Sequence, residues 1–152
     1  MNTLELQEVK LVGLSLGTTT TNKEGKSAID CGDLWQKFER GNYAEKIQNK
    51  ISDNIFAVYH QYEGDFTQPY SYFIGCNVKT DANIPEGMDT LILHKGTYQK
   101  IIARGIIPDC VANAWREIWN SAIPRAYQTD FEVYDGRSKD WNNAEVDIFL
   151  SV

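Results

Sequence analysis

The predicted elements of this chain follow one order twice, and this repeat limits the possible folds more than any other feature. In each half, alternating or one-sided apolar patterns predict a strand, a helix and two further strands. The first set comprises Val9–Thr18, Ile29–Arg40, Asn54–Gln61 and Tyr70–Lys79. The second set comprises Thr97–Arg104, Cys110–Ser121, Thr129–Asp135 and Ala144–Val152. The order therefore predicts two related units, at about residues 9–79 and 97–152.

Two short local matches support this duplication. One lies near the middle of each predicted helix, and the other lies in the third element of each unit. The matching segments are Leu34-Trp35 with Ala114-Trp115, and Phe56-Ala57-Val58-Tyr59 with Phe131-Glu132-Val133-Tyr134. If a pseudo-twofold axis relates the two units, Ala57 and Glu132 occupy equivalent places, and only Glu132 carries a charge.

Helix and turn signals set the expected boundaries. The second helix is the clearest, because its apolar residues recur on one face at helical spacing. Those residues are Val111, Ala114, Trp115, Ile118 and Trp119. In the first helix, Asp30 or Asp33 is expected to cap the N-terminus, and Gly41 is expected to end the helix. A further strand is expected at Thr90–Leu93.

The composition narrows the classes of partner. A chain of 152 residues fits a single domain spanning 1–152, or two small halves that share one core. A net charge of -6 argues against nucleic acid, which attracts dense Lys/Arg patches. The N-terminus does not read as a signal peptide, and no apolar stretch approaches the roughly 20 residues of a membrane helix. We therefore expect a cytoplasmic protein without direct nucleic-acid or membrane binding.

The cysteines and histidines indicate neither a metal site nor a catalytic nucleophile. Cys31, Cys76 and Cys110 are widely spaced, which predicts reduced and partly buried thiols. Cys31 and Cys110 are expected near helix starts, a position that can lower a thiol pKa, but neither has an obvious histidine partner. His60 and His94 lack metal-ligand spacing. No metal, cofactor or catalytic residue is therefore predicted.

Glu132 is the residue on which a function would depend, and its pattern allows two interpretations. In a strand, Asp130, Glu132 and Tyr134 point to one face, and the apolar residues between them point to the other. That polar face could be solvated, and the alternation alone favours this interpretation. We expect the same for Glu145 and Asp147 in the partner strand. Alternatively, Glu132 is the charged floor of a small-molecule pocket.

The aromatic residues bear on this choice, since the chain holds four tryptophans and eight tyrosines. Tryptophans on an apolar helix stripe usually pack in the core. Rings around one carboxylate are also what a site for flat organic cations requires, because each ring face attracts a cation by about 0.5–2 kcal/mol. A carboxylate sealed among rings is costly unless it is paired. The hydroxyls of Tyr59 or Tyr134 could hold it while the pocket is empty.

A series of motifs extends from about Val9 to Val152 in a specific order. The motifs are Leu34-Trp35-x-x-Phe38, Val58-Tyr59-x-x-Tyr62-Glu63-Gly64-Asp65-Phe66, Tyr72-x-x-Gly75, Ile84-Pro85-x-Gly87, Gly96-x-Tyr98, Trp115-x-x-Ile118-Trp119, Phe131-Glu132-Val133-Tyr134 and Ala144-Glu145-Val146-Asp147-Ile148. Together they resemble the GyrI-like and AraC-type effector-binding domains, and most of all the stand-alone, integron-cassette-like members. The resemblance implies an α+β fold with a duplicated βαββ unit. It also implies two SH2-like motifs about a pseudo-twofold axis, an antiparallel sheet, two main helices and a central ligand cleft.

The resemblance also implies roles for individual residues. In multidrug-responsive relatives, a glutamate in the Phe-Glu-x-Tyr strand meets lipophilic cations among aromatic rings. That role transfers to Glu132, with Tyr134 beside it. The candidates for the pocket wall are Tyr59, Trp115, Trp119, Trp35 and Tyr72. Full regulators carry a DNA-binding segment that this chain lacks, so we expect it to act with a separate regulatory protein partner or simply to bind its ligand.

Three functional hypotheses follow. The leading one is a non-enzymatic binding module for amphipathic, cationic organic compounds, linked to transcription regulation or drug response. The second is a GyrI-like hydrolase of small molecules, in which Glu132 acts on water and Tyr59 or Tyr134 orients it. The third is a protein-interaction module of the gyrase-inhibitor type, which uses its acidic surface against a basic partner.

Overall fold

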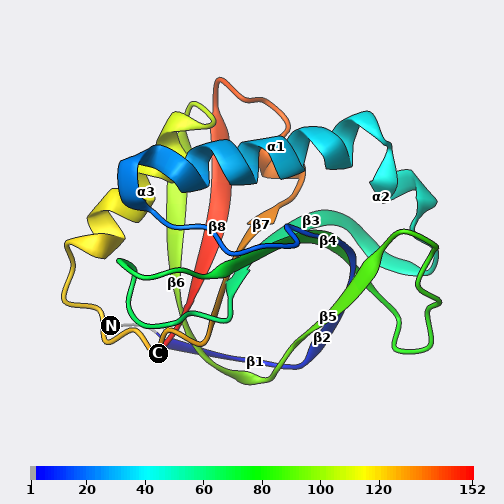
Figure 1. Ribbon diagram of the computed structural model, residues 1–152, viewed down its shortest axis with the longest axis horizontal. Coiled ribbons are helices and arrows are strands. Elements are labelled where there is room, and N and C mark those ends of the chain that lie inside the picture. Colours follow the sequence, from blue (N-terminus) through cyan, green and yellow to red (C-terminus); the bar gives the residue numbers. More distant parts are fainter. Residues whose placement is uncertain (1–2) are drawn as a thin grey trace.

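The structure of the protein is a computed structural model that describes residues 3–152. The helices are α1 Lys26–Arg40, α2 Tyr43–Lys46 and α3 Asp109–Trp119. The strands are β1 Thr3–Leu6, β2 Val9–Ser15, β3 Lys50–His60, β4 Ser71–Val78, β5 Asp89–Leu93, β6 Gly96–Gly105, β7 Thr129–Tyr134 and β8 Ala144–Ser151. Two short 3-10 turns lie at Lys23–Gly25 and Gly136–Ser138. The strands form one curled sheet, whose antiparallel pairing confirms the predicted α+β class (Figure 1).

The order of strands in the sheet displays the duplication. That order is β1-β6-β8-β7-β3-β4-β2-β5, so each strand of one half has its counterpart at the mirrored place in the other. The central strands β7 and β3 pair antiparallel, with Ala57 opposite Glu132 and Phe56 opposite Val133. The pseudo-twofold axis predicted from the sequence therefore passes between Ala57 and Glu132. Glu132, the one charge without a counterpart in the two Phe-x-Val-Tyr segments, therefore lies beside this axis.

The outermost strands cross between the two halves. β1 directly precedes β2 in the chain but pairs with β6, whereas β5 directly precedes β6 but pairs with β2. Leu6 lies opposite Gly96, and Leu93 lies opposite Val9, so the two exchanges are equivalent. Each half thus supplies the edge strand of the other, which covers an edge that would otherwise expose unpaired backbone groups. The sequence predicted β5 but not β1, which is only four residues long.

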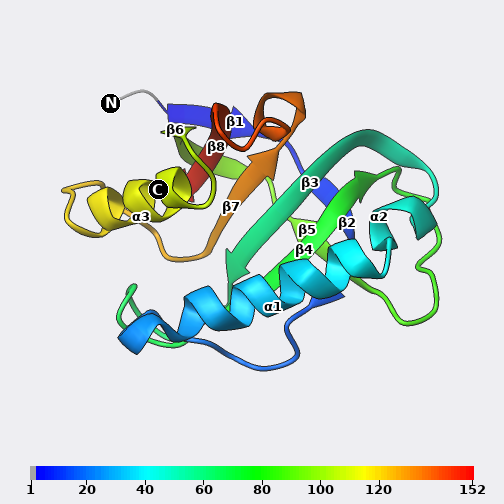
Figure 2. The same ribbon diagram turned by 90° about the horizontal axis from the view of Figure 1, so that it is seen from above.

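Both main helices cover the same face of the sheet (Figure 2). α1 lies over β4, and α3 lies over β6, on either side of the central pair β7-β3. Leu34 and Phe38 bury the apolar stripe of α1, and Ile118 lies in that of α3. Burying such a side chain contributes about 1.5–3 kcal/mol. The other face of β7 and β3 is covered by a second apolar cluster that includes Phe56 and Phe131. Polar residues on the helix-facing side of β7 are therefore shut away from water.

The start of α1 differs from the sequence prediction. The helix begins at Lys26, and the expectation that Asp30 or Asp33 caps it is wrong. Asp30 lies inside the helix, where its Oδ2 accepts hydrogen bonds from Thr20 Oγ1 and Lys26 Nζ, each at 2.7 Å. Its carboxylate therefore ties the preceding loop to the helix and does not satisfy the first backbone N–H groups. The predicted end of the helix at Gly41 is confirmed.

The expectation that Glu145 and Asp147 share a solvated face is wrong for Asp147. That residue is only 9% exposed, and its Oδ2 accepts a hydrogen bond from Arg137 Nη2 at 2.7 Å. The turn that follows β7 carries Arg137 to this face of the sheet, so the carboxylate is shielded and paired. Glu145 keeps a side chain that is 40% exposed, and it pairs with Arg104 at 2.9 Å.

Gly13 allows β2 and β4 to approach closely, because it has no Cβ atom. A Cβ atom at Gly13 would lie 1.9 Å from the carbonyl oxygen of Ile74. We expect Gly13→Ala to lower the free energy of unfolding by about 3 kcal/mol, because the strands would have to separate. In α1, a Cβ atom at Gly32 would have no other atom within 4 Å. Gly32→Ala should therefore raise the free energy of unfolding by about 0.5–1 kcal/mol. Urea unfolding of both variants measures this contrast, and a small effect at Gly13 would contradict the close approach.

Candidate functional site

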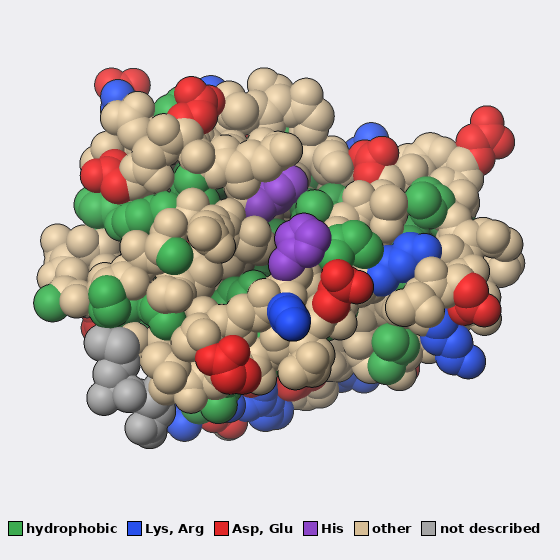
Figure 3. Space-filling model, turned by 90° about the horizontal axis from the view of Figure 1, so that it is seen from below, with side chains coloured by type: hydrophobic (Ala, Val, Ile, Leu, Met, Phe, Trp, Pro, Cys, Tyr) green, Lys and Arg blue, Asp and Glu red, His purple; other side chains and the backbone are tan. Residues whose placement is uncertain are grey.

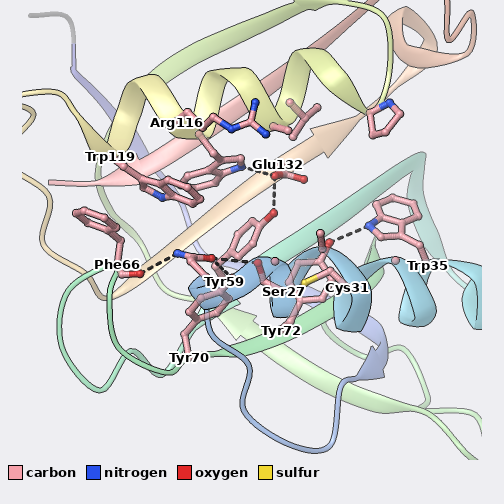
Figure 4. A pocket seen from close by; sticks show the side chains of 18 of the residues that line it. Ser27, Cys31, Trp35, Tyr59, Phe66, Tyr70, Tyr72, Arg116, Trp119 and Glu132 are labelled. Carbon is pink, nitrogen blue, oxygen red and sulfur yellow. Dashed lines mark hydrogen bonds between the residues drawn. The ribbon is translucent and has the colours of Figure 1, made fainter.

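A cavity of about 620 Å³ lies between the two helices and the centre of the sheet (Figure 4). Its wall is built from both halves of the chain, since α1, α3 and the central strands all contribute side chains. All seven residues that the sequence and the resemblance selected line it: Trp35, Tyr59, Tyr72, Trp115, Trp119, Glu132 and Tyr134. The pseudo-twofold axis passes between Ala57 and Glu132 at the sheet side of this cavity. The site therefore depends on both units.

Glu132 is 1% exposed and is held by three hydrogen bonds. Its Oε2 accepts from the hydroxyl of Tyr59 at 2.6 Å and from Nε1 of Trp115 at 2.6 Å. Its Oε1 accepts from the hydroxyl of Tyr134 at 2.7 Å. Asp130 on the same face of β7 is also fully buried. The solvated interpretation of this face is therefore wrong, and the reason is that the helices cover it.

The positions of the three donors follow from local structure. Tyr134 lies two residues beyond Glu132 in β7, so both side chains leave the strand on the same face. Tyr59 lies in β3, two residues from Ala57, which is the cross-strand partner of Glu132. Trp115 reaches down from the middle of α3, and its ring lies 4.9 Å from that of Tyr59. The carboxylate thus receives one donor from each of three elements.

Burial raises the pKa of Glu132 above its ordinary value, and the hydrogen bonds from Tyr59, Tyr134 and Trp115 only partly oppose this. The upward direction means that the loss of water outweighs the three donors. Because the native pKa lies above that of the unfolded chain, the native state binds the Glu132 proton more tightly. The contribution of this group to stability therefore falls as the pH rises above the unfolded value.

Within residues 3–152, no basic side chain forms an ion pair with Glu132. Two arginines line the cavity, but Arg125 pairs with Asp130 at 2.7 Å, and Arg116 is exposed and donates to Asn113. When Glu132 is ionised, its charge is therefore balanced only by neutral O–H and N–H donors. A buried anion in this state favours the entry of a cation.

The two helix tryptophans show how the halves have diverged. Nε1 of Trp115 donates to Glu132, whereas Nε1 of Trp35 in α1 donates to the hydroxyl of Tyr72 at 2.8 Å. Position 57, the counterpart of Glu132, is an alanine and offers no acceptor. Tyr72 supplies that acceptor in its place and is itself 1% exposed. Each of the two indole N–H groups thus has an acceptor. Of the two equivalent positions 57 and 132, only position 132 carries a charge.

The sequence of the chain matches a known family. The sequence model of Cass2, described as integron-associated effector binding protein, matches residues 4–152. The chain belongs to this family. The resemblance to integron-cassette-like effector-binding proteins is thereby confirmed at the level of sequence.

Individual relatives agree with the Cass2 assignment. The chain is similar to an integron cassette protein from the mobile metagenome of Vibrio cholerae, with 29% identity, a TM-score of 0.74 and coverage of 99% of this chain and 94% of that one. The structure of SAV2435 bound to tetraphenylphosphonium shares the fold, with a TM-score of 0.79, 21% identity and coverage of 99% and 92%. A Bacillus subtilis (strain 168) protein, YobU, named as a candidate transcriptional regulator, is 25% identical over 123 residues, which span 78% of this chain and 77% of that protein.

The cavity of this Cass2-family chain is also lined by residues that the sequence did not predict. The loop between β3 and β4 contributes Tyr62, Phe66 and Tyr70 to the wall. The ring of Phe66 stacks on that of Trp119, with centroids 5.8 Å apart and planes at 5°. Figure 4 shows this pair beside the cavity, at one end of the row of aromatic residues. The Tyr-Glu-Gly-Asp-Phe segment reads as a turn, so only its aromatic content could have indicated a role in the wall.

A second buried polar network adjoins the cavity in this Cass2-family protein. Asp130 is fully buried, and its Oδ2 accepts from the hydroxyl of Tyr62 and from Arg125 Nη2, each at 2.7 Å. Its Oδ1 accepts from the backbone N–H of Ser151 at 2.8 Å and from the Ser151 hydroxyl at 3.1 Å. The network joins β7, β8, the loop after β3 and the segment before β7. No periodicity or motif singled out Arg125.

Thiol and metal chemistry find no support in the described part of the chain. All three cysteines are free, and burial raises the thiol pKa of both Cys31 and Cys110. The lowering of a thiol pKa that a helix start can cause is therefore not found at either cysteine, because desolvation dominates. Residues 3–152 contain no group of three or more His, Cys, Asp or Glu side chains arranged to hold a metal ion. They also contain no helix with the length and apolar character that crossing a bilayer would require.

Proposed function

We propose that this Cass2-family protein binds amphipathic organic cations in the cavity between α1 and α3. The observation that carries the proposal is Glu132, a carboxylate that is 1% exposed, held by neutral donors and without an ion-pair partner among the described residues. A cation that enters the cavity gains the attraction of this charge, which is strong because the carboxylate is buried. The cation in turn supplies the neutralising charge that the protein does not.

The rings of the wall suit the apolar part of such a ligand. Nine aromatic side chains line the cavity: Trp35, Tyr59, Tyr62, Phe66, Tyr70, Tyr72, Trp115, Trp119 and Tyr134. Their faces attract a delocalised cation and their area removes its apolar surface from water. The volume of about 620 Å³ lies within the range of sites that enclose a drug-sized molecule. The fold neighbour that was solved with tetraphenylphosphonium supports this ligand class.

We propose that any link to gene regulation passes through a separate protein. The name of YobU supports a connection to transcription. The net charge of -6 disfavours direct contact with a phosphate backbone. On the face away from the helices, acidic and basic side chains are interspersed and form no basic patch (Figure 3). Regulation through a ligand-dependent contact with a partner protein agrees with both the acidic net charge and the lack of a basic patch on this face.

Two ions of the same shape and opposite charge test the proposal. Tetraphenylphosphonium and tetraphenylborate present the same four rings, so a purely hydrophobic cavity should bind both to a similar extent. We expect isothermal titration calorimetry to give an affinity for the phosphonium at least about 100-fold higher, because the buried carboxylate attracts one ion and repels the other. Equal affinities, or no binding of the phosphonium, would contradict the proposed function.

A further inference from the structure

The cavity is lopsided, although the fold around it follows a pseudo-twofold axis. Trp35 in α1 and Trp115 in α3 occupy equivalent places in the two units, and both line the cavity. One turn further along each helix, Trp119 also lines the cavity, whereas its counterpart Glu39 is exposed and does not. The cavity therefore extends further toward the C-terminal end of α3 than toward the C-terminal end of α1.

The loops that connect the inner strands show the same imbalance. The β3–β4 loop, residues 61–70, and the β7–β8 loop, residues 135–143, occupy equivalent places in the two units. The first loop contributes three aromatic side chains to the cavity wall, namely Tyr62, Phe66 and Tyr70. No residue of the second loop, which the structure describes throughout, lines the cavity. The cavity thus extends from Glu132, beside the axis, toward the end at which Phe66 and Trp119 lie (Figure 4).

Phe66 takes no part in the apolar core. None of the three clusters of apolar side chains in the described residues includes it or packs against it. Its ring is half-buried and stacks on that of Trp119, which is half-buried as well. Aromatic rings beside a cavity, carried on a loop that a rigid scaffold positions, are typical of binding sites. The ring of Phe66 therefore belongs to the cavity wall, and the core does not require it.

The β3–β4 loop is held in place in the free protein. The side chain of Asn22, in the segment before α1, donates from Nδ2 to the carbonyl oxygen of Phe66 at 2.8 Å. Its Oδ1 accepts from the hydroxyl of Tyr70 at 2.7 Å. Across the ends of the loop, the backbone N–H of Glu63 donates to the carbonyl oxygen of Pro69 at 2.9 Å. Because these bonds fix the loop before a ligand enters, binding at Phe66 requires little further ordering.

We propose that Phe66 and Trp119 form an aryl subsite, which binds an aromatic arm of the ligand while the cationic centre lies at Glu132. The proposal rests on the proposed cation binding and narrows its ligand class to elongated organic cations with an aryl arm. The indole of Trp115 donates to Glu132, and Trp119 lies one helical turn further, about 6 Å along the axis of α3. A propyl linker between the charge and the ring suits this separation.

Two isomeric probes test the subsite. Phenylpropyl-trimethylammonium and benzyl-diethyl-methylammonium contain the same atoms, one ring and one positive charge, and they differ in the distance between the charge and the ring. We expect the wild-type protein to bind the elongated phenylpropyl isomer about tenfold more tightly in calorimetric titrations, because its ring reaches those of Phe66 and Trp119. Equal affinities, tighter binding of the compact benzyl isomer, or binding of neither would overturn the proposal.

The variant Phe66→Ala isolates the role of the subsite. It removes one ring of the stacked pair and leaves the three apolar clusters of the core complete. We expect the preference for the elongated isomer to fall to within about twofold. Trp141→Ala is the matched control, since it removes a ring that is 57% exposed and does not line the cavity, and it should keep the preference. A preference that survives in Phe66→Ala, or that disappears in Trp141→Ala, would contradict the inference.

A crystal structure of the wild-type protein with the phenylpropyl isomer provides a test that needs no variant. The expected result places the centre of the ligand ring within about 7 Å of the ring centre of Phe66 or Trp119. A ligand ring directed into solvent, or toward Trp35, would refute the subsite. Tetraphenylphosphonium separates the two proposals. If the wild-type protein fails to bind it, the proposed cation binding fails. If it binds tetraphenylphosphonium but shows no preference between the isomers, only the aryl subsite fails.

Discussion

Replacing Glu132 by glutamine should weaken the binding of tetraphenylphosphonium at least about thirtyfold, a loss of about 2 kcal/mol or more. The change removes the charge but keeps the size and the hydrogen bonds. The amide oxygen can accept from Tyr59 and Trp115, and the amide N–H₂ can donate to the hydroxyl oxygen of Tyr134, which sits 2.7 Å from Glu132 Oε1. Isothermal titration calorimetry at pH 7 measures the loss.

The matched control is Glu145→Gln. Glu145 is a carboxylate of β8 with a side chain that is 40% exposed, and it pairs with Arg104 outside the cavity. Its substitution should change the affinity by less than about twofold, because water screens an exposed charge. Thermal unfolding should show Glu132→Gln to be at least as stable as the parent at pH 7, since burial raises the pKa of Glu132. Equal binding by the parent and Glu132→Gln would favour the surface-driven interaction that the sequence also suggested.

Replacing Asp130 by alanine should lower the free energy of unfolding by about 3–5 kcal/mol. Asp130 is fully buried, and its loss would leave Arg125 as a buried charge without a counter-ion. It would also remove the acceptor of the hydroxyl of Tyr62 and of the backbone N–H of Ser151. Because the network joins β7 to β8 and to two loops, the damage should reach the cavity wall. Urea unfolding monitored by tryptophan fluorescence measures the change.

Two further variants show whether the buried pair is the cause. Glu145→Ala breaks the exposed pair with Arg104 and should cost at most about 1 kcal/mol. The double variant Asp130→Ala/Arg125→Met removes both buried charges and should be more stable than Asp130→Ala alone. If Asp130→Ala costs no more than Glu145→Ala, the network does not stabilise the fold as its burial indicates.

Much of the fold could be predicted because the duplication appears in local patterns. The one-sided stripe around Trp115 predicts α3, and the two Phe-x-Val-Tyr segments predict the central strands. Their register, with Ala57 opposite Glu132, then follows from the pseudo-twofold axis. β1 was missed because four residues carry too short an alternation to be recognised, and its partner β6 is about 90 residues away. β1 is a strand because it pairs with β6 in the exchange of edge strands, a long-range contact that local patterns do not reveal.

The candidate site was predictable only in part, and the parity of β7 explains why. An alternating strand has two faces, and sequence alone does not say whether the polar face meets water or a helix. The resemblance to effector-binding domains selected the buried interpretation for Glu132. No resemblance indicated that Asp147 is buried. Its carboxylate is shielded by Arg137, which lies in the turn after β7 and donates a hydrogen bond to it. Arg125 could not be found either, because its importance depends on its ion pair with the buried Asp130.

The most direct test is a pH titration of the Glu132 side-chain carboxyl by carbon-13 NMR, with and without tetraphenylphosphonium. In the free protein, the midpoint should lie above the ordinary value of 4.5, because burial disfavours the charged form. Bound cation favours the ionised carboxylate, so the midpoint should move to lower pH in the complex. A midpoint that the phosphonium leaves unchanged would show that Glu132 does not pair with the ligand, and would contradict the proposed site.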